Sequence, residues 1–517
     1  RLKGAPRHFS IEGMSVRRPT GRELTAALAV LGHRRSWQAA VALLAAAAAE
    51  EVDLIALNAT VGACARGQAA AATLRLLGEA RRRGLAPDVV TYGAAISGHE
   101  RGRHWTGALA LFCEMGESVL VPDLVAYNAT ISACEKGRLW QEALGLLRCA
   151  ERRGLRPDVV SYGAAISACE KGARWVVALR LLWEMPRQSL RPNVIALNAA
   201  ISACGNGQQW ARGTLLLHEA RASALAPDVV SYNASISACG RGRQWARALE
   251  FSSEMIRHDI DLNVITFNAM VSACETGHHW AGALSVLGEL GRRGLAPDTI
   301  TYNATISACE KGEQPEVARR LLGEMRRKRA EPDAVSYSAT ISACEKGHDW
   351  ERALQLLVEM RRFDLRPNMI TYNASISACE RVHSWEQALV LLEEMRGVGI
   401  APDAGAHFSA LLALVGAGRL QRALELYRRA VEHGALRPWH RRELGVLDLH
   451  RFPAEVAKLA VRAAILDSLR EPSGQPVAGD GAAEVGTQPR LVFVTGRGTH
   501  SEDGEAVLRP AVLRVLR

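Results

Sequence analysis

The stretch from Val264 to Asp298, VITFNAMVSACETGHHWAGALSVLGELGRRGLAPD, recurs with variations along most of the chain. Ten such repeats of 35 residues follow one another without a gap, from Leu54–Asp88 to Met369–Asp403. Eight of the 11 tryptophans and nine of the 11 cysteines keep this spacing. A fixed period of about 20–50 residues is typical of a repeat architecture. We number the places of each repeat from 1 to 35, so that Val264 stands at place 1 and Asp298 at place 35.

Each repeat predicts an antiparallel pair of helices. Apolar residues recur at helical spacing after place 3, where Ser or Thr is a good N-cap, so the first helix is expected to start there. Gly at place 14 can adopt a positive φ and is expected to end it. A second helix is expected from the Trp at place 17 to the Pro-Asp turn. Such pairs bury their apolar faces only by stacking, so the predicted fold is mainly α, a right-handed α-solenoid of about ten repeats.

Length and composition agree with an extended array. The 517 residues exceed the roughly 250–300 at which one hydrophobic core stops growing. The net charge of +10 permits an anionic partner, and 48% apolar with 23% charged residues excludes wholesale disorder. No stretch reaches 18 uninterrupted apolar residues, so no membrane span is expected. One Cys per repeat in a constant helical phase predicts a buried core residue in a reducing compartment, not a disulfide.

The ends of the chain depart from the pattern. Residues 19–53 keep Trp37 but lose the Asn and Gly, and residues 404–439 keep Gly418 but lose the Trp and Cys, so both are predicted to be degenerate capping repeats. Residues 1–18 form a basic segment. Residues 1–22 carry several Arg and one Glu, as the remnant of an incomplete transit peptide would, which predicts an organelle, either chloroplast or mitochondrion.

Repeats such as Val229–Asn263 and Thr299–Asp333, with V-x-Y-N or a close variant at the start and Pro-Asp or an equivalent turn at the end, resemble the pentatricopeptide repeat family. The resemblance covers about 350 residues, from residue 54 to residue 403. It implies a protein that binds single-stranded RNA with one base per repeat, in organelle RNA processing or stability.

The resemblance implies that the residues at places 5 and 35 read the bases. Asn is a mediocre helix former, so its recurrence at place 5 asks for a compensating role, and its amide can address the Watson–Crick edge of a base. For place 35 the alternative is an Asx turn that ends each repeat. The predicted base-reading residues, in pairs, are Asn58 and Asp88, Gly93 and Asp123, Asn128 and Asp158, Gly163 and Asn193, Asn198 and Asp228, Asn233 and Asn263, Asn268 and Asp298, Asn303 and Asp333, Ser338 and Asn368, and Asn373 and Asp403.

Two further places carry one residue type in a constant phase. Place 2 is β-branched in all ten repeats, and the resemblance makes these side chains sandwich the bases, although packing alone would also select Val and Ile. Place 13 is basic in eight repeats, as expected for a stripe that follows an RNA backbone or for cations that stabilise a helix C-terminus. The predicted phosphate-binding cations are Arg66, Arg101, Lys136, Lys171, Arg241, Lys311, Lys346 and Arg381.

The two-residue code of the family predicts a U-rich target. In that code Asn with Asp favours U, Asn with Asn favours C or U, and Ser with Asn favours A. Read from the first repeat, the predicted bases are U, G, U, A, U, C or U, U, U, A and U. The second and fourth bases are poorly assigned, because Gly93 and Gly163 stand at place 5 there.

Residues 443–517 predict a small α/β segment with strands at GVLDLH and RLVFVT and a helix between them. Leu447–His450 and Thr495–Ser501 resemble the two motifs of the small MutS-related (Smr) domain, a nicking-endonuclease family. The resemblance makes Asp448, His450 and His500 candidate acid–base groups and Gly496, Arg497 and Gly498 a phosphate-binding loop. Arg451 replaces the usual Gly, and the final strand of the family is missing before Arg517.

Three functions therefore stay open: RNA binding alone, site-specific RNA cleavage by the Smr-like segment, and a protein-binding helical scaffold. The scaffold is disfavoured because it gives no reason for the Asn at place 5 with Asp at place 35. No cofactor and no metal ligands are predicted, and a divalent metal at the Smr-like segment remains an alternative.

Overall fold

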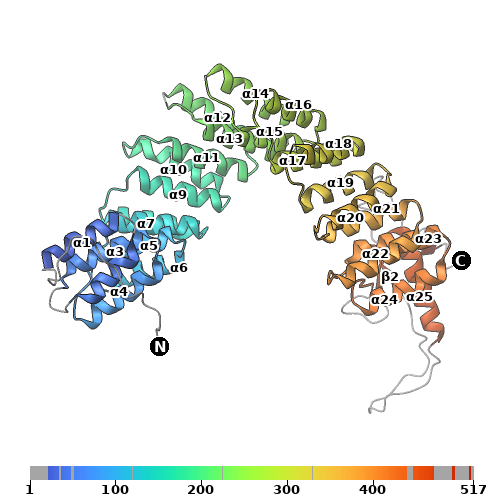
Figure 1. The fold of residues 1–517 in the computed structure, drawn as a ribbon, viewed down its shortest axis with the longest axis horizontal. Helices are drawn as coiled ribbons and strands as arrows, with labels where there is room; N and C mark the ends of the chain where they lie inside the picture. The colour runs from blue at the N-terminus through green and yellow to red at the C-terminus, as the bar shows by residue number, and fades with distance from the viewer. Residues whose placement is uncertain are drawn as a thin grey trace, which may run out of the picture. The chain divides into compact units, whose positions relative to one another are not determined.

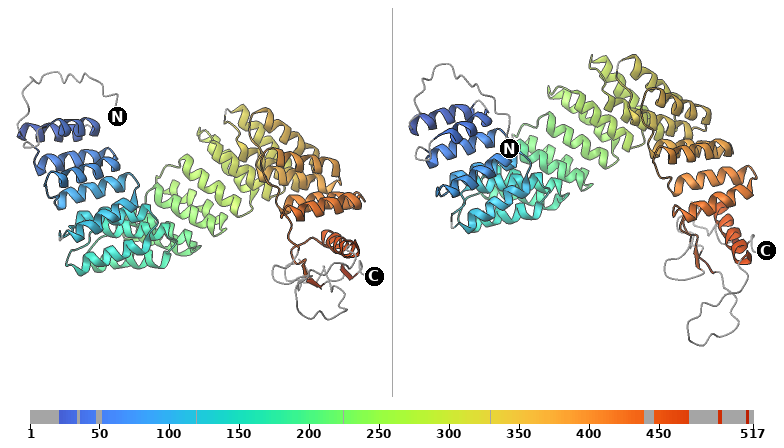
Figure 2. Two further views of the ribbon diagram at one scale, coloured as in Figure 1. Left: turned by 90° about the horizontal axis from the view of Figure 1, so that it is seen from below. Right: turned by 60° about the horizontal axis from the view of Figure 1, so that its bottom comes forward.

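The computed structural model describes residues 21–33, 36–47, 52–118, 120–223, 225–328, 330–438, 446–470, 492–494 and 512–513. The chain divides into two compact units, residues 1–262 and 263–517, each of which is a stack of helix pairs (Figures 1 and 2). The mainly α repeat fold predicted from the sequence is confirmed. None of the described helices is long and apolar enough to cross a membrane.

Two helices form each repeat. From α3 to α24 the first helix spans places 1–13 and the second places 17–29, whereas α1 and α2 of the N-terminal capping repeat have other bounds. In the first compact unit they are α1 (Gly21–His33), α2 (Trp37–Ala46), α3 (Leu54–Arg66), α4 (Ala70–Arg82), α5 (Val89–Arg101), α6 (Trp105–Glu117), α7 (Leu124–Lys136), α8 (Trp140–Arg152), α9 (Val159–Lys171), α10 (Trp175–Arg187), α11 (Val194–Asn206), α12 (Trp210–Ala222), α13 (Val229–Arg241) and α14 (Trp245–Arg257). In the second they are α15 (Val264–Thr276), α16 (Trp280–Arg292), α17 (Thr299–Lys311), α18 (Pro315–Arg327), α19 (Ala334–Lys346), α20 (Trp350–Arg362), α21 (Met369–Arg381), α22 (Trp385–Gly397), α23 (Ala404–Gly416) and α24 (Leu420–Glu432).

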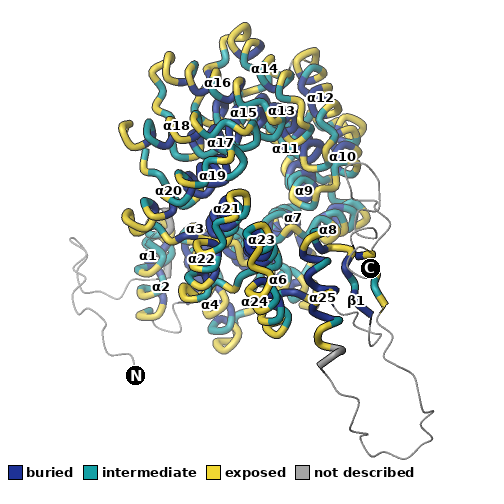
Figure 3. Tube along the Cα trace, turned by 90° about the vertical axis from the view of Figure 1, so that its right-hand side faces the viewer, coloured by how far each residue is buried: buried dark blue, intermediate teal, exposed yellow. Residues whose placement is uncertain are grey.

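Within each compact unit the first helices of successive repeats pack on one another in one layer. Each second helix packs on the first helix of its own repeat and on that of the next, as α16 does on α15 and α17. The buried residues accordingly lie between the helices of neighbouring repeats (Figure 3). The Cys at place 11 is buried in this core, and burial raises the pKa of the Cys274 thiol to about 11. The nine repeated cysteines are all free and buried, which confirms their prediction as core residues.

The first helix of each repeat begins at place 1, two residues earlier than predicted. The N-cap is the residue at place 35 of the preceding repeat: Asp298 accepts a hydrogen bond from the Thr301 backbone N–H at 2.8 Å and so caps α17. The prediction of Ser or Thr at place 3 as the N-cap was therefore wrong. A carboxylate is a stronger acceptor than a hydroxyl for the free N–H groups of a helix start. The hydroxyls stand one turn inside the helix, at Thr91, Ser161, Ser231, Thr266, Thr301, Ser336 and Thr371.

The predicted positive φ of the Gly at place 14 was also wrong. Gly277 has a φ of −84°, and it is the following residue, His278, that has a positive φ of 57°. At Gly137, Gly172, Gly207, Gly242 and Gly312 the Trp at place 17 of the preceding repeat packs directly against the Gly at place 14. Val382, which follows Trp350, is the exception to Gly at this place. A Cβ on Gly312 would lie 2.3 Å from Cδ1 of Trp280, well inside van der Waals contact.

Replacing Gly312 by Ala is therefore expected to destabilise the protein, by about 1–3 kcal/mol, because Trp280 or the helix end must shift. Gly323 lies inside α18, where an added Cβ would meet nothing within 4 Å. Gly323→Ala is the matched control and is expected to raise stability slightly, by up to about 1 kcal/mol. Urea unfolding of the two variants measures the difference, and equal effects would contradict the close-approach explanation.

The C-terminal segment packs on the last helix pair of the second compact unit, α23 and α24. Strands β1 (Val446–Asp448) and β2 (Val492–Val494) pair in parallel, with Leu447 opposite Phe493, and α25 (Ala454–Arg470) connects them in sequence. Helix α25 contacts α23 and α24, and Arg428 of α24 forms an ion pair with Asp467 of α25 at 2.5 Å. The strand–helix–strand order predicted from the sequence is thus present.

Candidate nucleic-acid interface

The β-branched side chains at place 2 are exposed in all ten repeats, with exposed fractions between 56% and 68%. They stand in the first turn of the first helices, on the side that faces away from the core. The sequence left packing as an alternative explanation, and this exposure removes it, because side chains that remain in water gain nothing from burial on folding. The residues are Ile55, Val90, Val125, Val160, Ile195, Val230, Ile265, Ile300, Val335 and Ile370.

The structure brings places 5 and 35 together, although they are 30 residues apart. The amide Nδ2 of Asn268 donates to the Asp298 carboxylate at 3.2 and 3.1 Å, and that of Asn303 donates to Asp333 at 3.1 and 3.3 Å. The same pairing occurs in four other repeats, between Asn58 and Asp88, Asn128 and Asp158, Asn198 and Asp228, and Asn373 and Asp403. Because each of these aspartates also caps the next first helix, the pair is held on a rigid element.

Hydrogen bonds lower the pKa of five of the capping aspartates. Partial burial works to raise the pKa of the Asp298 carboxyl, but hydrogen bonds from the Thr301 hydroxyl and backbone and from Asn268 outweigh it. Its pKa therefore lies below the usual value for Asp. The same balance lowers the pKa of Asp88, Asp158, Asp228 and Asp333. Each Asn–Asp pair thus presents a carboxylate, which accepts hydrogen bonds, beside an amide.

The other repeats differ at place 5. An added Cβ at Gly93 or Gly163 would meet nothing within 4 Å, so these two repeats present a gap where the others present an amide. Their partners Asp123 and Asn193 cap α7 and α11 through the backbone N–H groups of Ala126 and Ala196. Ser338 lies with its Oγ 2.8 Å from Oγ1 of Thr371, and Asn368 caps α21. The predicted pair of the sixth repeat is divided between the two compact units, with Asn233 in the first and Asn263 in the second.

The cations at place 13 are paired with carboxylates. Nζ of Lys311 lies 3.0 Å from the Glu275 carboxylate, which stands at place 12 of the preceding repeat. The Ser307 hydroxyl at place 9 donates to the same carboxylate at 2.8 Å. Lys136, Lys171, Lys346 and Arg381 form the equivalent pairs with Glu100, Glu135, Glu310 and Glu345. A phosphate that binds these five cations therefore competes with a carboxylate, and the recurring S-x-C-E-K pattern was the overlooked signal.

Arg241 differs from these cations because burial lowers the pKa of its guanidinium, against the opposing charge of Glu170. Gly205, in the preceding repeat, leaves room for the Arg241 side chain. A Cβ on Gly205 would lie 2.9 Å from the Arg241 guanidinium. Arg66 and Arg101 also end first helices, at the C-termini of α3 and α5. The helix-terminus explanation therefore applies to all eight cations.

Two of the candidate groups predicted for the C-terminal segment lie together. Asp448 ends β1, and its carboxylate contacts Nδ1 of the partly exposed His450. The end of a parallel strand is where α/β units place ligands. Gly496, Arg497, Gly498 and His500 lie outside the described residues.

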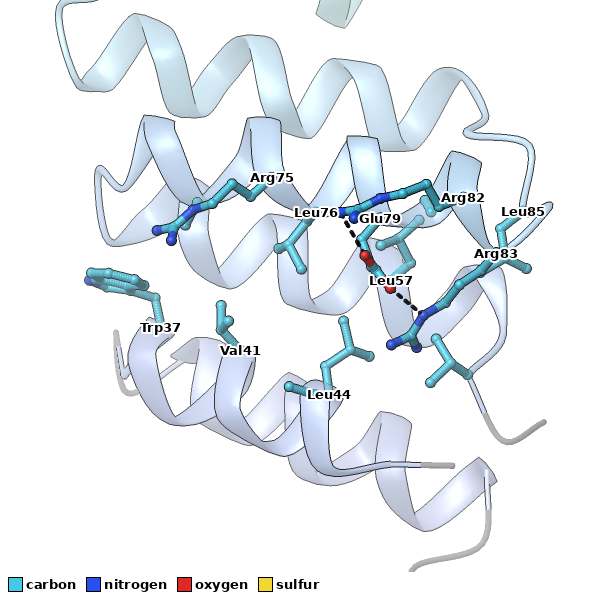
Figure 4. A pocket seen from close by; sticks show the side chains of 14 residues that line it. Trp37, Val41, Leu44, Leu57, Arg75, Leu76, Glu79, Arg82, Arg83 and Leu85 are labelled. Atoms are coloured by element: carbon cyan, nitrogen blue, oxygen red, sulfur yellow. Dashed lines mark hydrogen bonds and ion pairs between the residues drawn. The ribbon is translucent and has the colours of Figure 1, made fainter. Parts of the chain in front are cut away.

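A cavity of about 390 Å³ lies between α2 and α4 in the first compact unit (Figure 4). Trp37, Val41, Leu44 and Leu76 line it with apolar surface. The one carboxylate among its lining residues, Glu79, is paired with Arg82 and Arg83, so the cavity shows no acid–base or nucleophilic group free for chemistry.

Three sequence models of one family match the chain. The PPR repeat family model matches residues 227–276, 263–311 and 297–346, the pentatricopeptide repeat domain model residues 75–136, 145–207 and 355–418, and the PPR repeat model residues 125–155 and 335–365. Together they cover residues 75–207 and 227–418, more than half of the chain. Comparison with curated protein sequences found no match.

One solved structure agrees with the fold, and a second is similar with a lower TM-score. The pentatricopeptide repeat protein PPR10 from maize is similar with a TM-score of 0.54 and 22% sequence identity, over 87% of this chain and 67% of that one. PPR10 in complex with an 18-nt psaJ RNA element is similar with a TM-score of 0.35 and 19% identity, over 88% and 83% of the two chains. With the matched repeats, the first of these likenesses establishes the architecture, and the chain belongs to the pentatricopeptide repeat family.

Proposed function

We propose that this protein binds single-stranded RNA sequence-selectively, with one base per repeat. The observation that carries the proposal is the exposure of the Val and Ile side chains at place 2, six in the first compact unit and four in the second, together with the Asn–Asp pairs of six of these repeats. An unstacked base can lie between the aliphatic side chains at place 2 of two successive repeats. Its edge then meets the amide at place 5 and the carboxylate at place 35.

The chemistry of the pair suits base recognition. The Asn268 amide donates one N–H to Asp298 and keeps its second N–H for another acceptor. A base edge offers both donors and acceptors, and a matched contact is worth about 1–3 kcal/mol against the wrong base. Six repeats combine Asn with Asp, so the U-rich target stands as part of the proposal. The protein acts on organelle transcripts, in chloroplast or mitochondrion, by occupying its site in RNA processing or stability.

The test measures affinity for a U-rich RNA and for a C-rich RNA of equal length, over a range of salt concentrations. We expect preference for the U-rich strand and an affinity that falls steeply with salt, as phosphate contacts require. A protein-binding scaffold would bind neither RNA. Equal affinity for both strands would contradict selective reading.

A second candidate function, RNA cleavage by the Smr-like segment, is favoured by the contact between Asp448 and His450 at the end of β1. A carboxylate that orients an imidazole is a suitable acid–base pair for a phosphodiester. Incubation of the U-rich RNA with the protein and with an Asp448→Ala variant separates this function from binding alone. Equal product from both proteins would reject cleavage by this pair.

A further inference from the structure

We propose that the hydroxyl at place 3 of the following repeat fixes the orientation of the base-reading Asn. In the repeats of Asn58, Asn128, Asn268 and Asn303 the reading site is then a set of three residues. The inference rests on the proposed RNA-binding function. In the seventh repeat the set consists of Asn268, Asp298 and Thr301. Thr301 belongs to the next repeat and is fully buried, so it acts through Asn268 as a positioning residue and does not touch RNA.

The contacts form a closed triangle. Oγ1 of Thr301 lies 2.5 Å from Oδ1 of Asn268 and 2.7 Å from Oδ1 of Asp298, while Nδ2 of Asn268 donates to the same Asp298 carboxylate. Asn303 makes the same 2.5 Å contact with the Ser336 hydroxyl. Asn58 makes it with Thr91, and Asn128 makes it with Ser161.

The donors and acceptors permit one amide orientation. An ionised carboxylate only accepts hydrogen bonds, so the NH₂ group of Asn268 must face Asp298. The amide oxygen then faces the Thr301 hydroxyl, whose single proton can go to this oxygen at 2.5 Å or to the Asp298 carboxylate at 2.7 Å. A flipped amide would place its oxygen against the carboxylate, with two acceptors in contact. The hydroxyl therefore holds the oxygen in place, and the remaining N–H and oxygen lone pair of the amide point in a defined direction.

The distribution of residues at place 3 follows place 5 of the preceding repeat. Gly93 and Gly163, which have no amide to orient, are followed by Ala126 and Ala196. Asn or Ser at place 5 is followed by Ser or Thr in seven of eight repeats, the exception being Asn373, which is followed by Ala406. Oδ1 of Asn373 is buried and accepts no hydrogen bond within the described part of the chain.

Helix capping alone does not explain this distribution. The place-3 hydroxyl also accepts from the N-cap backbone N–H in α5, α9, α13, α19 and α21, but no such bond is described at α15 or α17, where Thr also stands at place 3. The place-35 side chain caps α7 and α11 at 2.8 Å, although Ala stands at place 3 of both helices. The cap at α17, where Thr301 stands at place 3, has the same length. In the fifth repeat Ser231 donates to Asp228, and Oδ1 of Asn198 has no partner among the described residues. Oδ1 of Asn233 has none there either, although Thr266 stands at place 3 of the next repeat.

The loss-of-function test replaces Thr301 by Ala in the full chain and selects bound sequences from a pool of randomised RNA. We expect the selectivity at one RNA position to fall about 3- to 10-fold, the worth of one hydrogen bond, with the other positions unchanged. Thr301→Ser keeps the hydroxyl and is expected to retain the selectivity. If Thr301→Ala lowers the melting temperature or the affinity for all sequences equally and leaves the selectivity as it was, the role is structural and the inference is overturned.

The gain-of-function test supplies the missing hydroxyl by Ala406→Thr, beside Asn373. Selectivity at the last RNA position is expected to rise about 3- to 10-fold. Ala126→Thr adds the same group beside Gly93 and is the matched control, for which no change is expected. A rise in both variants, or in neither, overturns the inference while leaving RNA binding intact. If the parent protein selects no RNA sequence, the proposed function and this inference both fail.

Discussion

Replacing Ile265 and Ile300 by Asp is expected to weaken binding of the preferred RNA by about 100-fold or more. Both side chains are exposed at place 2, at 65% and 66%. A base that lies between them would lose apolar contact and meet a charge that it must desolvate, and two lost contacts of about 1–2 kcal/mol each account for a change of this size. Equilibrium binding with the selected RNA measures the loss.

The folded state is expected to tolerate this change. The substituted residues stand in the first turns of α15 and α17, where a negative charge interacts favourably with the helix dipole. The matched control replaces Val358 and Val390 by Asp, since these are exposed on the second helices α20 and α22. We expect unchanged RNA affinity for the control pair. Equal losses from both pairs would show that the place-2 row has no special part in binding.

Replacing Asn303 by Thr is expected to move the base preference of the eighth repeat from U toward G, by roughly 10- to 100-fold in relative affinity. The two-residue code of the pentatricopeptide repeat family predicts that the preference moves toward G. The free energy of one base-edge contact, about 1–3 kcal/mol, sets the size of the expected change in affinity. Asn303 donates to Asp333 and accepts from Ser336, so the substitution changes the groups offered to the base at this repeat only. Sequencing of RNA selected by the variant gives the result, with the other nine positions as internal controls. A preference for U that persists at every position would contradict the assignment of Asn303.

The repeat period alone predicted the helix pairs, their order and the burial of the Cys at place 11. Such features depend on residues close in sequence, because helical spacing and turn residues act locally. The strand–helix–strand order of the C-terminal segment was predicted for the same reason. The base-reading residues at places 5 and 35 were also predicted, but from the resemblance to the pentatricopeptide repeat family.

The two errors concern residues whose partners belong to a neighbouring repeat. Gly312 looked like a helix stop, but the constraint on it is the indole of Trp280, 32 residues earlier. Thr301 was predicted to be an N-cap, but Asp298 is the N-cap, and the Thr301 hydroxyl contacts both Asp298 and Asn268. Sequence rules for helix ends could not reveal these contacts with a neighbouring repeat. Gly is also a common residue after a helix, and Thr is also a common N-cap.

The sequence by itself determined the number of repeats, the helical layers and the places that carry amide, carboxylate and β-branched residues. Only the tertiary structure decided what each place does: that Ile300 faces water, that Asp298 both caps a helix and holds Asn268, and that Lys311 is paired with Glu275. Stacking brings residues about 30 to 36 positions apart into contact. Hydrogen bonds and ion pairs depend on that distance in space and not on separation along the chain.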